Sequence, residues 1–166
     1  MKTAINHFYL SLVTLLICIT FSNAQNNDFK LFDNNPQNVS RKSLSTNDRT
    51  LLQELVYNKM ATAYFMDNKV DMPIKLSTER IVTDVTSFPL LNREKSKTVQ
   101  VVVVKILNNT ELRKTIDFSV FKNFPNLKCV YISCEIRANQ QQILQMIKKD
   151  KNSQVPMTFM GINIPQ

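Results

Sequence analysis

Two apolar stretches in the second half of the chain decide the fold: Val99–Leu107 (VQVVVVKIL) and Leu127–Cys134 (LKCVYISC). β-Branched and aromatic residues dominate both stretches, and such residues favour β-strands. The first stretch is apolar on both faces apart from Gln100 and Lys105, which is typical of a strand covered on two sides. The sequence therefore predicts a sheet that contains these two strands and is covered by other elements.

A third strand-like run, residues 155–164, follows after a helix expected at about residues 139–149. A short helical turn is expected at residues 117–123, between the first two strands. Connections between parallel strands of one sheet are right-handed crossovers in nearly all proteins. These elements together predict a three-stranded parallel βαβαβ unit.

The region upstream of this unit shows two other patterns. Residues 48–66 have apolar side chains at three- and four-residue spacing, which predicts an amphipathic helix, with Thr50 and Gln53 as its capping box. Residues 71–77 alternate between apolar and polar and predict an edge strand, with residues 80–86 as its antiparallel partner. The expected fold class is α/β, with an N-terminal helix and a β-hairpin before the parallel unit.

The first 24 residues have the pattern of a secretory signal peptide. Lys2 precedes an apolar segment at residues 8–21, and the small residues Ser22 and Ala24 fit cleavage after Ala24. The apolar segment is 14 residues long, whereas a helix that spans a membrane needs about 20 residues. We therefore expect a secreted or periplasmic protein with no transmembrane anchor after cleavage.

The remaining chain is expected to have two parts. Residues 25–45 are polar and predict a flexible lead-in, and residues 46–166 predict a single α/β domain. The leader and the Asn- and Lys-rich chain that follows it resemble exported proteins of Bacteroidota.

Several residue types that carry chemistry are scarce. His7, the only histidine, lies in the leader, so cleavage would leave no imidazole for a catalytic triad or a metal site. Gly161 is the only glycine, which excludes a glycine-rich dinucleotide-binding motif and a P-loop. We expect no catalytic residue, no metal and no cofactor.

Cys129 and Cys134 lie five residues apart in one predicted strand. Five strand residues span roughly 16 Å, whereas a disulfide needs Cα atoms within about 7 Å. The odd offset also places the two side chains on opposite faces of the strand. We therefore expect two buried thiols and no disulfide.

The three strand-like runs share an apolar frame. Positions 101, 104, 106 and 109 align with 127, 130, 132 and 135, and these with 155, 158, 160 and 163, at spacings of 26 and 28 residues. The frame resembles the LxxLxLxxN core of leucine-rich repeats, whose units have about 20–29 residues. This resemblance covers residues 101–163 and implies a short solenoid that recognises a macromolecule through its strand face. An ordinary α/β sheet is the alternative.

The carboxyl ends of the strands are the expected place for a ligand in a doubly wound sheet. One carboxylate and three amides would meet at that rim: Asn108, Asn109, Glu135 and Asn163. They could hold a small polar ligand. Glu135 could also act as a general base, with Asp117 as a partner if the loop between the strands folds back.

Positive charge concentrates in residues 99–166, which carry +5 of the chain's formal net charge of +8. Seven cationic side chains of this region could form a patch: Arg113, Lys114, Lys122, Lys128, Lys148, Lys149 and Lys151. Such a patch would attract an acidic protein or an anionic envelope component. Nucleic acid is disfavoured by the export signal.

The sequence thus predicts an exported, non-catalytic binding or interaction protein. A carboxylate-dependent enzyme, or a binder of a small polar ligand at the carboxyl ends of the strands, is the alternative function.

Overall fold

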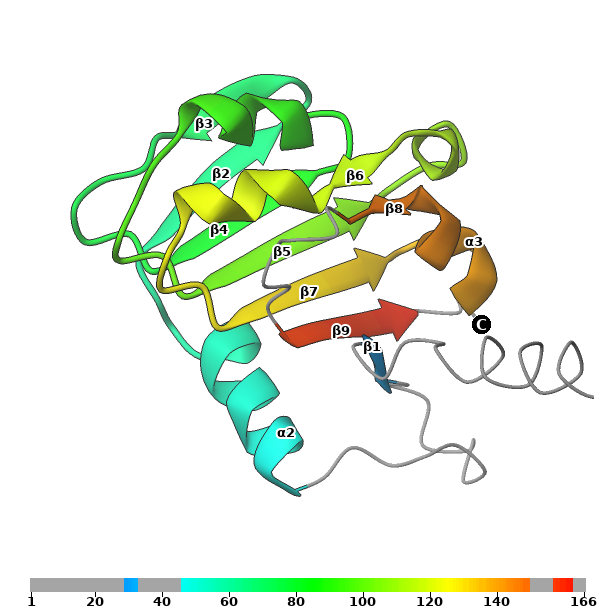
Figure 1. Cartoon of the computed structure of the whole chain (residues 1–166), viewed down its shortest axis with the longest axis horizontal. Helices are drawn as coiled ribbons and strands as arrows, with labels where there is room; N and C mark the ends of the chain where they lie inside the picture. Colours follow the sequence, from blue (N-terminus) through cyan, green and yellow to red (C-terminus); the bar gives the residue numbers. More distant parts are fainter. Residues whose placement is uncertain (1–28, 33–45, 150–156, 163–166) are drawn as a thin grey trace, which may run out of the picture.

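The computed structural model describes residues 29–32, 46–149 and 157–162 of the chain (Figure 1). The predicted signal peptide, most of the predicted lead-in, Lys151 and Asn163 lie outside the described residues. The α/β class is confirmed: the described residues form a mostly parallel central sheet with a few helices.

The main sheet of the described residues has seven strands in the order β1-β9-β7-β5-β4-β2-β3. The pairing is parallel throughout, except between β2 and β3. The strand bounds are β1 Phe29–Phe32, β2 Thr62–Met66, β3 Lys69–Met72, β4 Arg80–Asp84, β5 Val101–Ile106, β7 Cys129–Cys134 and β9 Met157–Ile162.

Short helical segments connect these strands. Their bounds are α2 Thr46–Leu52, the π-helical turn η1 Gln53–Tyr57, the 3-10 helices η2 Phe88–Arg93, η3 Glu111–Arg113 and η4 Phe118–Asn123, and α3 Gln140–Met146. Two further strands, β6 Ile116–Asp117 and β8 Ile147–Lys148, pair in parallel with each other outside the main sheet.

The helix predicted at residues 48–66 is wrong in its second half. The helical backbone ends at Tyr57, and Thr62–Met66 forms β2. In β2, Ala63 and Phe65 are buried and Tyr64 between them is exposed, so the segment also fits the two-residue period of a strand. Thr50 is not a helix cap, because the helix begins before it and its hydroxyl donates to the Thr46 carbonyl at 3.0 Å.

The predicted hairpin is also wrong. The observed hairpin joins β2 to β3 through Asp67 and Asn68, whose φ values of 53° and 58° suit a tight turn between antiparallel strands. Residues 80–86 were expected to pair antiparallel with residues 71–77, but β4 lies parallel between β2 and β5. The parallel part of the sheet therefore extends upstream of the predicted three-stranded unit.

The connections between the parallel strands cover one face of the sheet. The buried core on this face joins β5, β7 and the other strands to the apolar residues of η2, η4 and α3. In Figure 1 these segments, drawn in green, yellow and orange, lie above the sheet, whereas α2 lies below it. Each parallel strand from β2 through β4, β5 and β7 to β9 lies next to its predecessor, so the chain crosses the sheet in one direction.

The opposite face is covered by α2 and η1. Leu52 and Leu55 of these segments form a second buried core with Val101, Tyr131 and Phe159 of the sheet. Arg80 of β4 fixes the end of this helical segment, because its guanidinium donates to the Val56 carbonyl at 2.6 Å and to the Asn58 carbonyl at 3.2 Å.

The strand register differs in part from the predicted frame. Val102 pairs with Val130, and Val130 pairs with Thr158, so the step between these strands is a constant 28 residues. The frame that aligned residue 101 with residue 127 is therefore displaced by two residues. A displacement of two residues keeps every side chain on the same face of the sheet. Because β5 has consecutive valines, its apolar pattern fits both alignments.

Candidate functional site

The polar rim predicted at the carboxyl ends of the strands is present only in part. Asn108 follows β5, and its side-chain oxygen accepts from the backbone N–H groups of Thr110 at 3.1 Å and Glu111 at 3.2 Å. Glu135 follows β7 and forms an ion pair with Lys105 at 2.9 Å. Asn109 is exposed. Within the described residues no hydrogen bond joins these side chains to one another, and ligand binding at this rim stays a prediction.

Asp117 does not complete this rim. It caps the N-terminus of η4 on the face of the connections, where its carboxylate accepts from Ser119 N at 3.0 Å and pairs with Lys148 at 3.2 Å. The hydrogen bonds from Ser119, followed by the contact with Lys148, lower the pKa of this carboxyl group. The pairing of Asp117 with Glu135 that the sequence left open is therefore not observed.

Two buried carboxylates at the carboxyl ends were missed by sequence reasoning. Asp84, at the end of β4, accepts from Ser87 N at 2.5 Å and from Asp67 N at 2.7 Å. The Ser87 hydroxyl in turn accepts from Asn68 N at 2.7 Å. Asp84 thus ties the β2–β3 turn to the turn after β4.

Glu111 is the second buried carboxylate, with 1% of its surface exposed. One oxygen accepts from Leu107 N at 2.7 Å, and the other accepts from Thr86 N at 3.3 Å and the Thr86 hydroxyl at 3.0 Å. Lys114 donates to the same hydroxyl at 2.7 Å. A polar residue three positions after a turn-forming Asn108 is the signal that could have drawn attention to Glu111.

Asp84 and Glu111 therefore act as acceptors for backbone N–H groups that turns would leave unsatisfied. Their oxygen atoms are engaged by main chain rather than directed at an open cavity. A general base needs an oxygen that can reach a substrate proton, and neither Asp84 nor Glu111 offers one in this arrangement.

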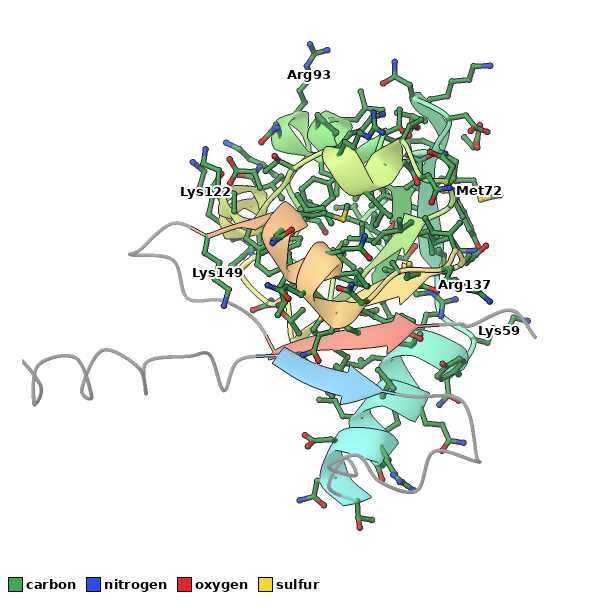
Figure 2. All side chains as sticks on the ribbon, turned by 90° about the vertical axis from the view of Figure 1, so that its right-hand side faces the viewer. Lys59, Met72, Arg93, Lys122, Arg137 and Lys149 are labelled. Atoms are coloured by element: carbon green, nitrogen blue, oxygen red, sulfur yellow. The ribbon has the colours of Figure 1, made fainter. Side chains whose placement is uncertain are left out.

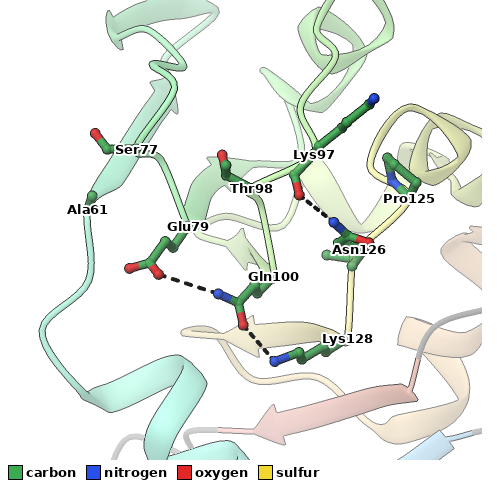
Figure 3. A pocket seen from close by; sticks show the side chains of 10 residues that line it. Ala61, Ser77, Glu79, Lys97, Thr98, Gln100, Pro125, Asn126 and Lys128 are labelled. Atoms are coloured by element: carbon green, nitrogen blue, oxygen red, sulfur yellow. Dashed lines mark hydrogen bonds between the residues drawn. The ribbon is translucent and has the colours of Figure 1, made fainter.

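The amino ends of the strands contain the open grooves. One groove, of about 940 Å³, lies where β2, β4, β5 and β7 begin (Figure 3). Across it Lys128 donates to the Gln100 side chain at 2.7 Å, and Gln100 donates to Glu79 at 3.4 Å. Asn126 closes one side by donating to the Lys97 carbonyl at 2.7 Å.

A second groove, of about 860 Å³, adjoins the first and shares Lys97, Thr98 and Pro125 with it. We call it the lysine groove. It is lined by Ile74, Lys75, Leu76, Lys95, Ser96, Lys97, Thr98, Lys122, Asn123 and Pro125. The lining contains four lysines and no carboxylate.

The four lysines of this groove are all exposed. No ion pair joins any of them to a carboxylate within the described ranges. The lysine groove therefore presents positive charge that the described part of the protein does not neutralise.

The predicted basic patch is split between different parts of the molecule. Lys122 lines the lysine groove, and Lys128 lines the adjoining groove. Arg113 and Lys114 lie near the carboxyl ends, and Lys148 pairs with Asp117. Lys149 is half-buried, and in Figure 2 it lies on the same side as Lys122 and opposite Met72.

Three of the four lysines in the groove were not in the predicted patch: Lys75, Lys95 and Lys97. The signal that could have found Lys97 is its position just before β5, because residues that precede parallel strands share one edge of the sheet. Lys128 precedes β7 in the same way.

The strand face next to α2 is largely covered. Tyr131 on β7 is buried beneath this segment. Burial, then the neighbouring Tyr57 phenol, raises the pKa of the Tyr131 phenol. Cys129 is buried on the same face and Cys134 on the opposite face. A side chain buried in this way cannot contact a macromolecular partner.

The structure offers no other site of a familiar kind among the residues it describes. Within those residues no three histidine, cysteine or acidic side chains gather as metal ligands would. None of the described helices has the length and apolar character to cross a membrane. Comparisons with protein families, curated proteins and solved structures give no match.

Proposed function

We propose that this protein is an exported binding protein that holds an anionic partner in the lysine groove. The observation that carries the proposal is the set of four exposed lysines around one groove without a carboxylate in its lining. Like charges held close together repel one another, so an anion that enters the groove removes this repulsion and gains attraction from all four.

The other surfaces considered as binding sites support this choice, because other parts of the protein already cover or engage them. The carboxylates of Asp84 and Glu111 at the carboxyl ends of the strands bind backbone N–H groups, and α2 with η1 covers the strand face of β5, β7 and β9. The edge strand β3 is short, has Lys69 and contains a register irregularity beside Tyr64. These features protect a sheet edge from pairing with another chain.

We also propose that the parallel strands form a short solenoid of the leucine-rich-repeat type. One contact recurs where successive strands begin: a backbone carbonyl accepts from two consecutive N–H groups of the next strand. Ala61 accepts from Glu79 and Arg80, Glu79 from Gln100 and Val101, and Gln100 from Lys128 and Cys129. Strands that follow one direction, with connections on one face, are what stacked repeats produce.

Export to the periplasm or the medium is part of the proposal. It is supported by the signal-peptide pattern of residues 1–24. Intact-mass measurement of the exported protein tests it. A chain that begins at Gln25 is expected, and a full-length chain in the cytoplasmic fraction would contradict it.

Titration with inorganic polyphosphate, followed by NMR, tests the lysine groove. The largest amide shifts are expected in the segments that contain Lys75, Lys95 and Lys122. The variant Lys95→Gln/Lys97→Gln should bind more weakly than Lys59→Gln/Lys69→Gln, which removes the same charge from exposed residues outside the groove. Equal weakening in both variants would show general attraction by net charge and would overturn the proposal.

A further inference from the structure

The turn at residues 75–78 holds a leucine out in solvent. Leu76 is 96% exposed, whereas the other exposed large apolar side chains of the described residues are between 37% and 56% exposed. A side chain this open gains nothing from the folded state, since burial of apolar surface is what stabilises a fold.

The turn that carries Leu76 is fixed rather than loose. Thr78 N donates to the Lys75 carbonyl at 3.0 Å, and Lys75 N donates to the Thr78 hydroxyl at 2.8 Å. The Thr98 hydroxyl donates to the Thr78 carbonyl at 2.7 Å and ties the turn to the next loop. Thr78 is buried, and Ile74 packs against the main core. Leu76 is therefore presented at the tip of an anchored turn.

The lysines of the groove share its lining with this leucine. Lys75 precedes it in the chain, and Lys95, Lys97 and Lys122 line the same groove. An exposed apolar side chain that shares a groove with four cations matches the surface of an anionic bilayer, where headgroup phosphates lie above an apolar interior. Each lysine near such a surface and each apolar group inserted below it adds to the affinity.

We propose that this rim docks on a lipid bilayer with anionic headgroups, with Leu76 inserted and the four lysines on the phosphates. The inference rests on the proposed function, because it uses the same lysine groove and names its partner. An acidic protein segment is the less favoured occupant, because a partner protein would need a pocket shaped for the protruding leucine. A fluid bilayer accepts such a side chain without a preformed pocket.

The docking should be reversible and sensitive to salt. One leucine and four lysines supply less apolar insertion than a single acyl chain, which itself gives only marginal binding. Attraction between exposed lysines and headgroups is screened within about 10 Å at moderate ionic strength. Added salt should therefore release the protein.

Co-sedimentation with vesicles tests the proposal, using the protein recovered after export. Vesicles of phosphatidylcholine with phosphatidylglycerol should bind it, and vesicles of phosphatidylcholine alone should not. Leu76→Ser should weaken binding about tenfold, from the free energy of burying a leucine. Lys95→Gln/Lys97→Gln should weaken it about thirtyfold, at about fivefold per lysine.

Matched controls change the same chemistry elsewhere. Met72→Ser removes an exposed apolar side chain that does not line the groove, and Lys59→Gln/Lys69→Gln removes two distant charges. Both should bind like the parent protein. Circular dichroism of every variant shows whether its fold is intact, and the altered residues are all exposed.

The outcomes separate this inference from the proposed function. Binding of polyphosphate at the groove without binding of the anionic vesicles would overturn the inference and leave the proposed function standing. If neither binds, both are wrong. If Leu76→Ser binds vesicles as tightly as the parent, or if neutral vesicles bind equally well, insertion into an anionic bilayer is overturned.

Discussion

Replacement of Glu111 by alanine is expected to destabilise the protein strongly, although Glu111 lies beside a rim that sequence reasoning assigned to ligand binding. Its carboxylate is buried and accepts from Leu107 N, Thr86 N and the Thr86 hydroxyl. In Glu111→Ala, two backbone N–H groups lose their acceptor. Each buried donor left unsatisfied costs about 1–3 kcal/mol.

The expected total is about 2–4 kcal/mol in the free energy of unfolding, because Leu107 and Thr86 are half-buried and water reaches them in part. Glu111→Gln keeps one acceptor oxygen but turns an amide N–H toward a donor, so its loss should be smaller, at about 1–2 kcal/mol. Against a typical stability of about 5–15 kcal/mol, both losses are measurable.

Urea unfolding followed by circular dichroism provides the assay, since the chain has no tryptophan. The midpoint should fall in the order parent, Glu111→Gln, Glu111→Ala, with an unchanged slope if the variants remain two-state. A Glu111→Ala stability within about 0.5 kcal/mol of the parent would refute the structural role. The carboxylate would then be available for another purpose, and the enzymatic alternative would regain support.

Three further predictions concern other groups. Glu135→Gln should change stability by less than about 1 kcal/mol, since its ion pair is exposed; an activity lost with the fold intact would show that the protein is not solely a binder. Burial raises the pKa of the Cys129 thiol to about 12 from 9.0, so the folded state keeps its proton where the unfolded chain loses it. The stabilisation that this proton provides is therefore fully present below pH 9, and the free energy of unfolding should fall by up to about 1.4 kcal/mol per pH unit from there toward pH 12. Cys129→Ala should reduce this pH dependence when unfolding by urea is measured at several pH values. An unchanged pH dependence would contradict the assignment to Cys129. A Cβ at Gly161 would overlap the Tyr131 side chain, so Gly161→Ala should lower the free energy of unfolding by about 1–3 kcal/mol, as measured by thermal unfolding. The same substitution should lower it much less in a Tyr131→Leu background, and equal losses in the two backgrounds would count against the clash.

The sequence predicted the strands of the second half well because their patterns are local. The runs around β5, β7 and β9 combine β-branched residues with continuous apolar character, and few other structures bury such runs. The short helical turn at residues 117–123 is likewise observed, as η4 with Asp117 as its cap. Each of these features depends on residues within one short segment.

The first half was harder to predict because its patterns fit two structures. The apolar side chains of residues 60–66 suit a helical stripe, and the alternation around Tyr64 suits a strand. What decides is the pairing of β2 with β4, a contact between residues 18 positions apart, such as Ala63 with Ile81. Pairing partners of this kind are not visible in a local pattern.

The lysine groove could not be predicted from any one segment, because three separated segments of the chain contribute to it. Its location was nevertheless open to inference. The rule that places polar residues at the carboxyl ends of parallel strands also places the residues before those strands at one shared edge. Lys97 and Lys128 satisfy that second condition, because Lys97 lies four residues before β5 and Lys128 lies immediately before β7.

Charge is used differently at the two ends of the sheet, and this difference makes the proposed function testable by stability as well as by binding. At the carboxyl ends, Asp84 and Glu111 satisfy main-chain donors, so their removal should destabilise the protein rather than abolish the binding of a ligand. At the amino ends, Lys97 lies in the lysine groove with three like charges and no carboxylate partner among the described residues. Lys97→Gln should therefore leave the free energy of unfolding unchanged or raise it by a few tenths of a kcal/mol, to about 0.5. A residue whose replacement weakens anion binding and spares or improves stability is retained for the ligand. If Lys97→Gln instead lowers stability in urea unfolding by more than about 1 kcal/mol, the lysine is part of the fold, and its effect on binding no longer identifies a site.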